Sequence, residues 1–180
     1  SLPITTGLIL CAPVLIEVLC GTKFEASILP SQIIAPIILM VAISNVMGLQ
    51  VLYPKGKINM VTLCCGIGAI ADLLLNVCLI PHYSYIGTSI AYLGAEVSTT
   101  VSMYFIGKRY IPIQYFKLNH LNYLLGCVVM AFVIYILSQM HFSNVILLVL
   151  QGILGALSYA FILFIRKDAF LIQVLNKIKR

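Results

Sequence analysis

The sequence predicts an all-α integral membrane protein, a bundle of six transmembrane helices. Of the 180 residues, 62% belong to the set AVILMFWYC and only 9% are charged, whereas a soluble domain carries about 25% charged residues. Six apolar runs have the length of roughly 20 residues that a helix needs to cross a bilayer. Every Lys and Arg except Lys23 falls in gaps on one side of this arrangement.

Short polar or Pro/Gly segments separate the six runs. None of the six runs shows segments of about 10 residues that alternate between apolar and polar, which are typical of a membrane barrel. Helices, in contrast, satisfy their backbone polar groups internally. The runs are Leu2–Cys20, Ile28–Tyr53, Ile58–Ile80, Ile86–Ile106, Leu121–Met140 and Val145–Ile165. We therefore expect four spans in 1–106, a connector in 107–120, two additional spans in 121–165 and a basic tail in 166–180.

The basic residues predict the orientation of the spans. One side holds the Lys55–Lys57 turn, the connector with Lys108, Arg109 and Lys117, and the basic tail. An excess of Lys and Arg marks the cytoplasmic side, so we expect both ends of this segment in the cytoplasm. The chain opens on Ser1 without the pattern of a signal peptide, and we expect it to be the back part of something longer.

The composition argues against soluble and enzymatic functions. Nucleic-acid binding needs a basic face on a soluble fold, and a soluble enzyme needs more polar surface than this chain has. All six cysteines lie in apolar runs without a C-x-x-C pair, where a thiol acts as a small hydrophobe. No catalytic motif is present, so we expect no enzyme, no metal and no cofactor.

Asp72 lies in the middle of the third run. At a helix centre an Asp costs about 2.5–3.5 kcal/mol on insertion, whereas each Leu, Ile or Val returns about 0.3–0.6 kcal/mol. Asp72 and Asn76 share a helix face with small residues, and this face should meet protein or water instead of lipid. We expect both to line a cavity. The alternative is a structural acid that is hydrogen-bonded to neighbouring helices.

The fourth run has two distinct faces. One is small and predicts close helix packing; its members are Gly87, Ala91, Gly94, Ala95 and Ser98. The other is polar, includes Tyr92, Glu96 and Thr99, and is expected to line the same cavity.

Proline and small residues mark two further runs. Pro30 and Pro36 predict a kink in the second run, and Asn45 and Gln50 follow as candidate cavity-lining residues. In the last run a small-residue ladder of Gly152, Ala156 and Ala160 predicts helix packing.

Two stretches carry a family resemblance, NVMGLQVLYPKGK (Asn45–Lys57) and LLLNVCLIPHYSYIGTSIAYLGAE (Leu73–Glu96). They resemble the C-terminal half of bacterial polysaccharide flippases of the Wzx type, in the superfamily of multidrug, oligosaccharidyl-lipid and polysaccharide exporters. The matching positions are Gly48, Gln50, Pro54, Gly56, Lys57, Asn76, Leu79, Ile80, Pro81, Tyr83, Gly87, Ala91 and Glu96. The family usually has an uncharged residue where this chain has Asp72.

The resemblance implies a two-lobed transporter in the bacterial cytoplasmic membrane. It implies translocation of undecaprenyl-diphosphate-linked oligosaccharide repeat units during polysaccharide biosynthesis. The expected partners are this lipid-linked substrate, membrane lipids, the missing N-terminal lobe and a polysaccharide polymerase. No nucleic acid is expected.

Two other functions stay open at this point. A multidrug or metabolite cation antiporter of the same superfamily would suit the acids Asp72 and Glu96. A membrane enzyme or assembly subunit of polysaccharide synthesis is the second alternative, although the enzyme would need a longer extracytoplasmic loop than the sequence offers.

Overall fold

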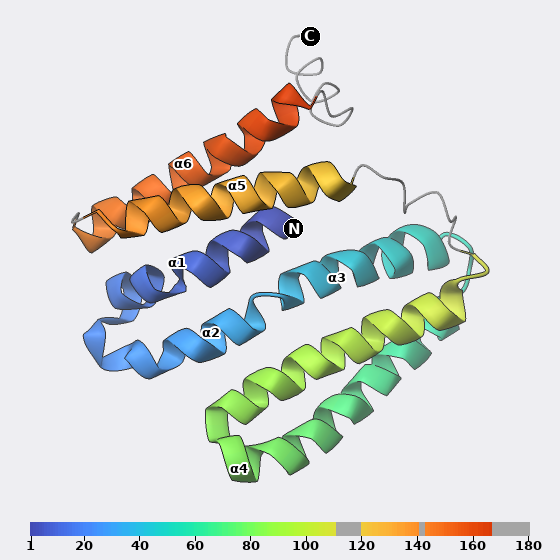
Figure 1. The fold of residues 1–180 in the computed structure, drawn as a ribbon. Coiled ribbons are helices and arrows are strands. Elements are labelled where there is room, and N and C mark those ends of the chain that lie inside the picture. Colours follow the sequence, from blue (N-terminus) through green and yellow to red (C-terminus); the bar gives the residue numbers. More distant parts are fainter. Residues whose placement is uncertain (111–119, 141–142, 167–180) are drawn as a thin grey trace. The chain divides into compact units, whose positions relative to one another are not determined.

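The computed structural model of this chain describes residues 1–110, 120–140 and 143–166, and most of them are helical (Figure 1). No strand occurs in these ranges, so the predicted all-α class is confirmed. Most of the predicted connector (111–119) and nearly all of the predicted basic tail (167–180) lie outside the described residues.

The helices follow the apolar runs of the sequence. They are α1 (Leu2–Cys20), the 3₁₀-helix η1 (Thr22–Ser27), α2 (Ile28–Ile34), α3 (Ile37–Asn45), the π-helix η2 (Val46–Leu52), α4 (Ile58–Gly107), α5 (His120–Ser138) and α6 (Asn144–Ile165). Four described stretches are long and apolar enough to cross a membrane: Leu2–Cys20, Thr22–Leu52, Ile58–Gly107 and Asn144–Ile165. Asn122–Ser138 in α5 is a shorter apolar helix.

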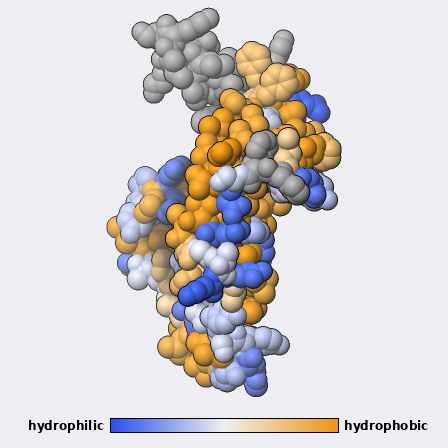
Figure 2. Space-filling model, turned by 90° about the vertical axis from the view of Figure 1, so that its left-hand side faces the viewer, coloured by the Kyte–Doolittle hydropathy of each residue, from blue (hydrophilic) through white to orange (hydrophobic). Residues whose placement is uncertain are grey.

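Large apolar side chains reach the surface along these helices. Hydrophobic residues cover much of the face drawn in Figure 2, with hydrophilic residues in smaller patches between them. Leu73, Val77 and Val128, for example, are each more than 60% exposed. Such a surface is typical of helices surrounded by lipid, and it fits a multi-pass membrane protein.

The second run breaks where a proline removes a backbone donor. α2 ends at Ile34, and α3 begins after Pro36, whose ring cannot continue the ladder of hydrogen bonds. Pro30 lies in the first turn of α2, where the N–H would lack an intrahelical partner anyway. The predicted kink is therefore confirmed at Pro36 and not at Pro30.

α4 is a hairpin of two antiparallel helical arms (Figure 1). Ser84, with φ 47° and ψ −125°, turns the chain between residues 58–83 and residues 85–107. The arms correspond to the third and fourth apolar runs. They approach closely beside the turn, where a Cβ added at Gly87 would lie 2.6 Å from the Leu79 carbonyl oxygen.

The chain forms two compact units, which we describe separately. The hairpin unit contains α2, α3, η2 and α4; the three-helix unit contains α1, α5 and α6. This grouping differs from the division made from the sequence, which placed Leu2–Cys20 with the three runs that follow it. Length and hydropathy define where helices lie along the chain but not which helix faces meet.

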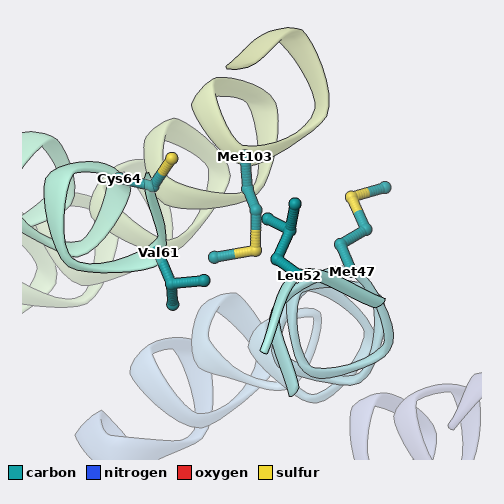
Figure 3. Close-up of a cluster of buried hydrophobic side chains, with 5 residues drawn as sticks. All are labelled: Met47, Leu52, Val61, Cys64 and Met103. Atoms are coloured by element: carbon teal, nitrogen blue, oxygen red, sulfur yellow. The ribbon is translucent and has the colours of Figure 1, made fainter. Parts of the chain in front are cut away.

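A sulfur-rich core holds one end of the hairpin unit together. Figure 3 shows Met103 of the second α4 arm reaching toward Leu52 of η2 and Val61 of the first arm. Met47 and Cys64 complete the buried cluster. A side-chain hydrogen bond from Thr100 Oγ1 to the Met40 carbonyl oxygen, 3.3 Å long, ties the second arm to α3.

The three-helix unit is packed through α5. A Cβ added at Gly7 of α1 would meet Met130 at 3.0 Å, and one at Gly126 would meet Tyr159 of α6 at 2.9 Å. The predicted small-residue ladder of α6, in contrast, is not buried in this unit. Gly152, Ala156 and Ala160 are exposed, and nothing lies within 4 Å of a Cβ built at Gly152.

The ladder prediction is therefore wrong for the described residues. The buried positions of α6 are Leu147, Gln151, Gly155 and Leu163, on a face that includes Gly155 but not Gly152. Spacing alone identifies a stripe of small residues and does not say whether that stripe faces a neighbouring helix or lipid.

Gly87→Ala should destabilise the hairpin, because the new Cβ meets the backbone of the opposite arm and one arm must shift. We expect a loss of about 1–3 kcal/mol, as for other overpacked sites. The control is Gly66→Ala in the first arm, where a Cβ meets nothing within 4 Å and helix propensity favours Ala by about 1 kcal/mol. The midpoint of thermal unfolding in detergent should fall for the first variant and not for the second; equal midpoints would contradict the close approach.

Candidate functional site

A groove of about 530 Å³ lies between α3, η2 and the two arms of α4 in the hairpin unit. The first arm contributes lining residues that recur at helical spacing on one face, namely Val61, Cys65, Gly68, Ala69 and Asp72. The remaining lining residues are Val41, Ser44, Asn45, Gly48, Leu49, Tyr53, Tyr92, Ala95, Glu96, Thr99 and Met103. The lining combines small side chains with polar side chains from α3 and from both arms of α4.

Asp72 is the acid contributed by the first arm. It is half-buried, and its Oδ1 accepts a hydrogen bond of 3.0 Å from Asn76 Nδ2 one turn later. The same Nδ2 donates to the Asp72 carbonyl oxygen at 2.9 Å. Asn76 Oδ1 is buried without a hydrogen-bond partner. The pair thus leaves an acceptor unsatisfied in a hollow large enough to hold water.

Two further hollows meet the groove at Asp72. One, of about 510 Å³, is lined by Asp72, Asn76 and Tyr92 together with Ser27, Pro30, Ile34, Tyr85, Thr88 and Ser89. Another, of about 540 Å³, lies along the first arm from Ala69 to Pro81. Asp72 and Tyr92 belong both to the groove, which reaches Tyr53, and to the hollow that reaches Tyr85.

The charged side chains that line the groove are acidic. Asp72 and Glu96 lie on opposite arms, and the described lining residues include no Lys, Arg or His. Oxygen acceptors without a basic partner attract cations and accept hydrogen bonds from hydroxyl groups. Tyr53 and Tyr92 add aromatic rings to the same walls.

The structure brings together most of the residues that the sequence nominated for a cavity. Asn45, Asp72, Tyr92, Glu96 and Thr99 all line the groove. Asn76 lines the two adjoining hollows instead. Gln50 is exposed on η2 and is not among the lining residues of the groove.

The face nominated for packing lies mainly between the arms. Gly87, Ala91 and Ala95 are buried, whereas Gly94 and Ser98 are half-buried. A Cβ added at Gly94 would meet Leu75 Cδ1 at 2.6 Å. Ala95 also lines the groove, so the packing face and the groove share an edge.

Sequence reasoning missed several polar residues of these hollows. Tyr53 lines the groove, and Thr88 and Ser89 line the hollow beside Tyr85. Tyr53 lies at the end of an apolar run, a position that favours the interpretation of an interfacial aromatic residue. Thr88 and Ser89 lie next to the hairpin turn, where polar residues are common and give no signal of a cavity.

Among the described residues, no group of three His, Cys, Asp or Glu side chains is placed to hold a metal ion. Comparisons with protein-family models, curated proteins and solved structures find no match to this chain.

Water in the groove can be tested with two adjacent cysteines. Cys65 lines the groove, whereas Cys64 is fully buried in the core beside it. In full-length variants that keep one cysteine each, a small hydrophilic thiol reagent should modify Cys65 at least about tenfold faster than Cys64, because the reactive thiolate forms only with access to water.

The control for that experiment is Cys78, which is exposed on the first arm but does not line the groove. A lipid-facing thiol should react as slowly as Cys64. If Cys65 reacts as slowly as Cys64, the groove is not hydrated.

Proposed function

We propose that this chain is part of a membrane transporter that moves undecaprenyl-diphosphate-linked oligosaccharide across the bacterial cytoplasmic membrane. The observation that carries this proposal is the line of hollows through the hairpin unit. Asp72 and Tyr92 are shared by the groove that reaches Tyr53 and by the hollow that reaches Tyr85. A polar track along apolar helices is what a hydrophilic headgroup needs to cross hydrocarbon.

The chemistry of the track suits a sugar. Carboxylate and amide oxygens of Asp72, Glu96 and Asn45 accept hydrogen bonds from hydroxyl groups. Tyrosine rings offer flat apolar faces with a polar end, and Tyr53 and Tyr92 supply them. Since the described lining has no cation, the diphosphate of such a lipid would lie outside this groove.

The proposed topology has six spans, with α4 counted as two. Lys55 Nζ donates to the Tyr110 carbonyl oxygen at 2.5 Å, so the turn after η2 and the end of α4 lie at one end of the hairpin unit. Ser27 and Tyr85 line one hollow at the other end. This arrangement supports placing the Lys55–Lys57 turn and the start of the connector on one side of the membrane; the cytoplasmic assignment of that side and of the chain ends rests on the basic residues of the sequence.

Transport would require a second lobe. In transporters built from repeats, two lobes rock about a central site and expose it to each side in turn. We propose that an N-terminal lobe forms the other wall of the track. A polysaccharide polymerase would then use the translocated repeat units.

A cation antiporter is the second candidate. It is favoured by the acidic lining, in which Asp72 and Glu96 have no basic residue beside them among the described lining residues. A cationic substrate would neutralise these carboxylates, whereas a neutral sugar would leave their charge in place. No described feature favours a membrane enzyme or an assembly subunit.

Asp72→Asn and Glu96→Gln should each reduce oligosaccharide translocation at least about tenfold, a change of ~1.4 kcal/mol in the barrier. Each substitution removes a charge that lines the track. The matched control is Glu17→Gln, because Glu17 is an exposed acid of α1 and lies outside the groove. The measurement is polysaccharide export in bacteria that lack their own flippase and express the full protein.

The same cells separate the two candidate functions. Loss of polysaccharide with unchanged efflux of an organic cation supports the flippase. Loss of cation efflux with normal polysaccharide supports the antiporter, and wild-type behaviour of both variants in both assays would refute a transport role for this groove.

A further inference from the structure

Two lysine side chains converge on one tyrosine ring at the end of the hairpin unit. Lys55 Nζ lies 5.9 Å and Lys57 Nζ lies 5.4 Å from the centroid of the Tyr110 ring. Lys55 also donates a hydrogen bond of 2.5 Å to the Tyr110 carbonyl oxygen. We call Lys55, Lys57 and Tyr110 the lysine–tyrosine cluster.

The backbone on both sides fixes the cluster. The turn that carries the lysines is closed by hydrogen bonds from Gly56 N to the Tyr53 carbonyl and from Lys57 N to the Leu52 carbonyl, both 3.0 Å long. Gly56 has φ 68°, a conformation that other residues rarely adopt. Tyr110 N donates to the Gly107 carbonyl at 2.8 Å, and Tyr110 packs against the buried cluster around Met103.

Among the described residues, this end of the unit carries positive charge without an acid to balance it. Lys108 and Arg109 immediately precede Tyr110 and are exposed. Asp72 and Glu96 are the acids of the unit in its described part. Each is about 14 residues along a helical arm from the cluster, or roughly 20 Å at the rise of an α-helix.

Two ammonium groups held over one ring repel each other, and an anion between or beside them would offset this repulsion. The ring face attracts both cations, but it carries no net charge. Lys55 uses one of its three donors on the Tyr110 carbonyl, so it keeps donors for another acceptor. The cluster is therefore preorganised for a compact anion with several oxygens.

We propose that the lysine–tyrosine cluster binds the phosphate group of an anionic membrane lipid. Lysine binds phosphate as a point charge, and basic pockets beside membrane helices bind anionic headgroups. The cluster flanks the apolar arms of α4, with Lys57 just before the first arm and Tyr110 just after the second. Helices that cross a bilayer end at the headgroup layer, and tyrosine favours this layer. The site does not depend on what the groove transports.

The experiment measures lipid binding to the purified full-length protein by native mass spectrometry. Phosphatidylglycerol is titrated against zwitterionic phosphatidylcholine. Lys57→Gln should weaken phosphatidylglycerol binding about fivefold, the effect of one cation near a headgroup, and Lys55→Gln/Lys57→Gln should weaken it further. Lys57→Arg should retain binding. Tyr110→Leu, which keeps an apolar side chain but removes the ring, should also weaken it.

The charge-matched control is Lys23→Gln, because Lys23 is an exposed lysine outside the hairpin unit. Equal effects of Lys23→Gln and Lys57→Gln would overturn the proposal, since binding would then follow net charge alone. Displacement of phosphatidylglycerol by excess inorganic phosphate would overturn the lipid assignment and identify free phosphate as the ligand. Circular dichroism of each variant verifies that the helices persist, and only variants that retain the wild-type spectrum are scored.

Discussion

The absence of hydrogen-bond partners in hydrocarbon governs this structure, because it forces each backbone polar group to find a partner within its own helix. Departures from regular helix are therefore concentrated at a few places. The chain breaks at Pro36, continues as the π-helix Val46–Leu52, where Tyr53 N donates to the Gly48 carbonyl, and turns at Ser84. Gly48 and Tyr53 line the groove, so helix irregularity and polar hollow occur together.

Small residues perform two tasks in the hairpin unit. At Gly87 they let the arms of α4 approach until backbone meets backbone, with the Leu79 carbonyl oxygen 2.6 Å from a built Cβ. Farther along the arms, Gly68 also lies against the second arm, since a Cβ built there would clash with Thr99 Oγ1. The neighbouring Ala69 is exposed and lines the groove. What lies opposite each small residue therefore decides whether it allows close helix contact or leaves open volume. The acids Asp72 and Glu96 line the groove beside these small residues.

Much of the fold was predictable from hydropathy, because a helix that crosses lipid needs about 20 mainly apolar residues and such runs are visible in the sequence. Leu2–Cys20 and the break at Pro36 agree with the structure. The association of α1 with α5 and α6 was not predictable, because their apolar faces differ little in chemistry. The exposed position of Gly152 was not predictable either, because the faces of an apolar helix differ little in chemistry. The gap between the third and fourth runs predicted a turn near Ser84 but not its conformation, because a serine with φ 47° occupies a region for which glycine is the usual residue. In the site, helical spacing identified Asp72, Glu96 and Thr99, but placing Gln50 required the geometry of η2.

The charge distribution links the groove to the ends of the unit. A carboxylate among apolar arms is costly unless it is hydrated or partnered, and one hydrogen bond from Asn76 does not satisfy Asp72. Asn76 Oδ1 is itself buried without a partner, so the pair increases the need for water or a polar ligand. The basic residues that would neutralise these acids lie at the far end, where they hold Tyr110 instead. Because the two sets of charges are kept apart, the middle of the hairpin unit has the chemistry to accept hydrogen bonds from hydroxyl groups or to attract cations, and its end has the chemistry to attract anions. The two proposed transport functions therefore differ in the ligand that would lie beside Asp72.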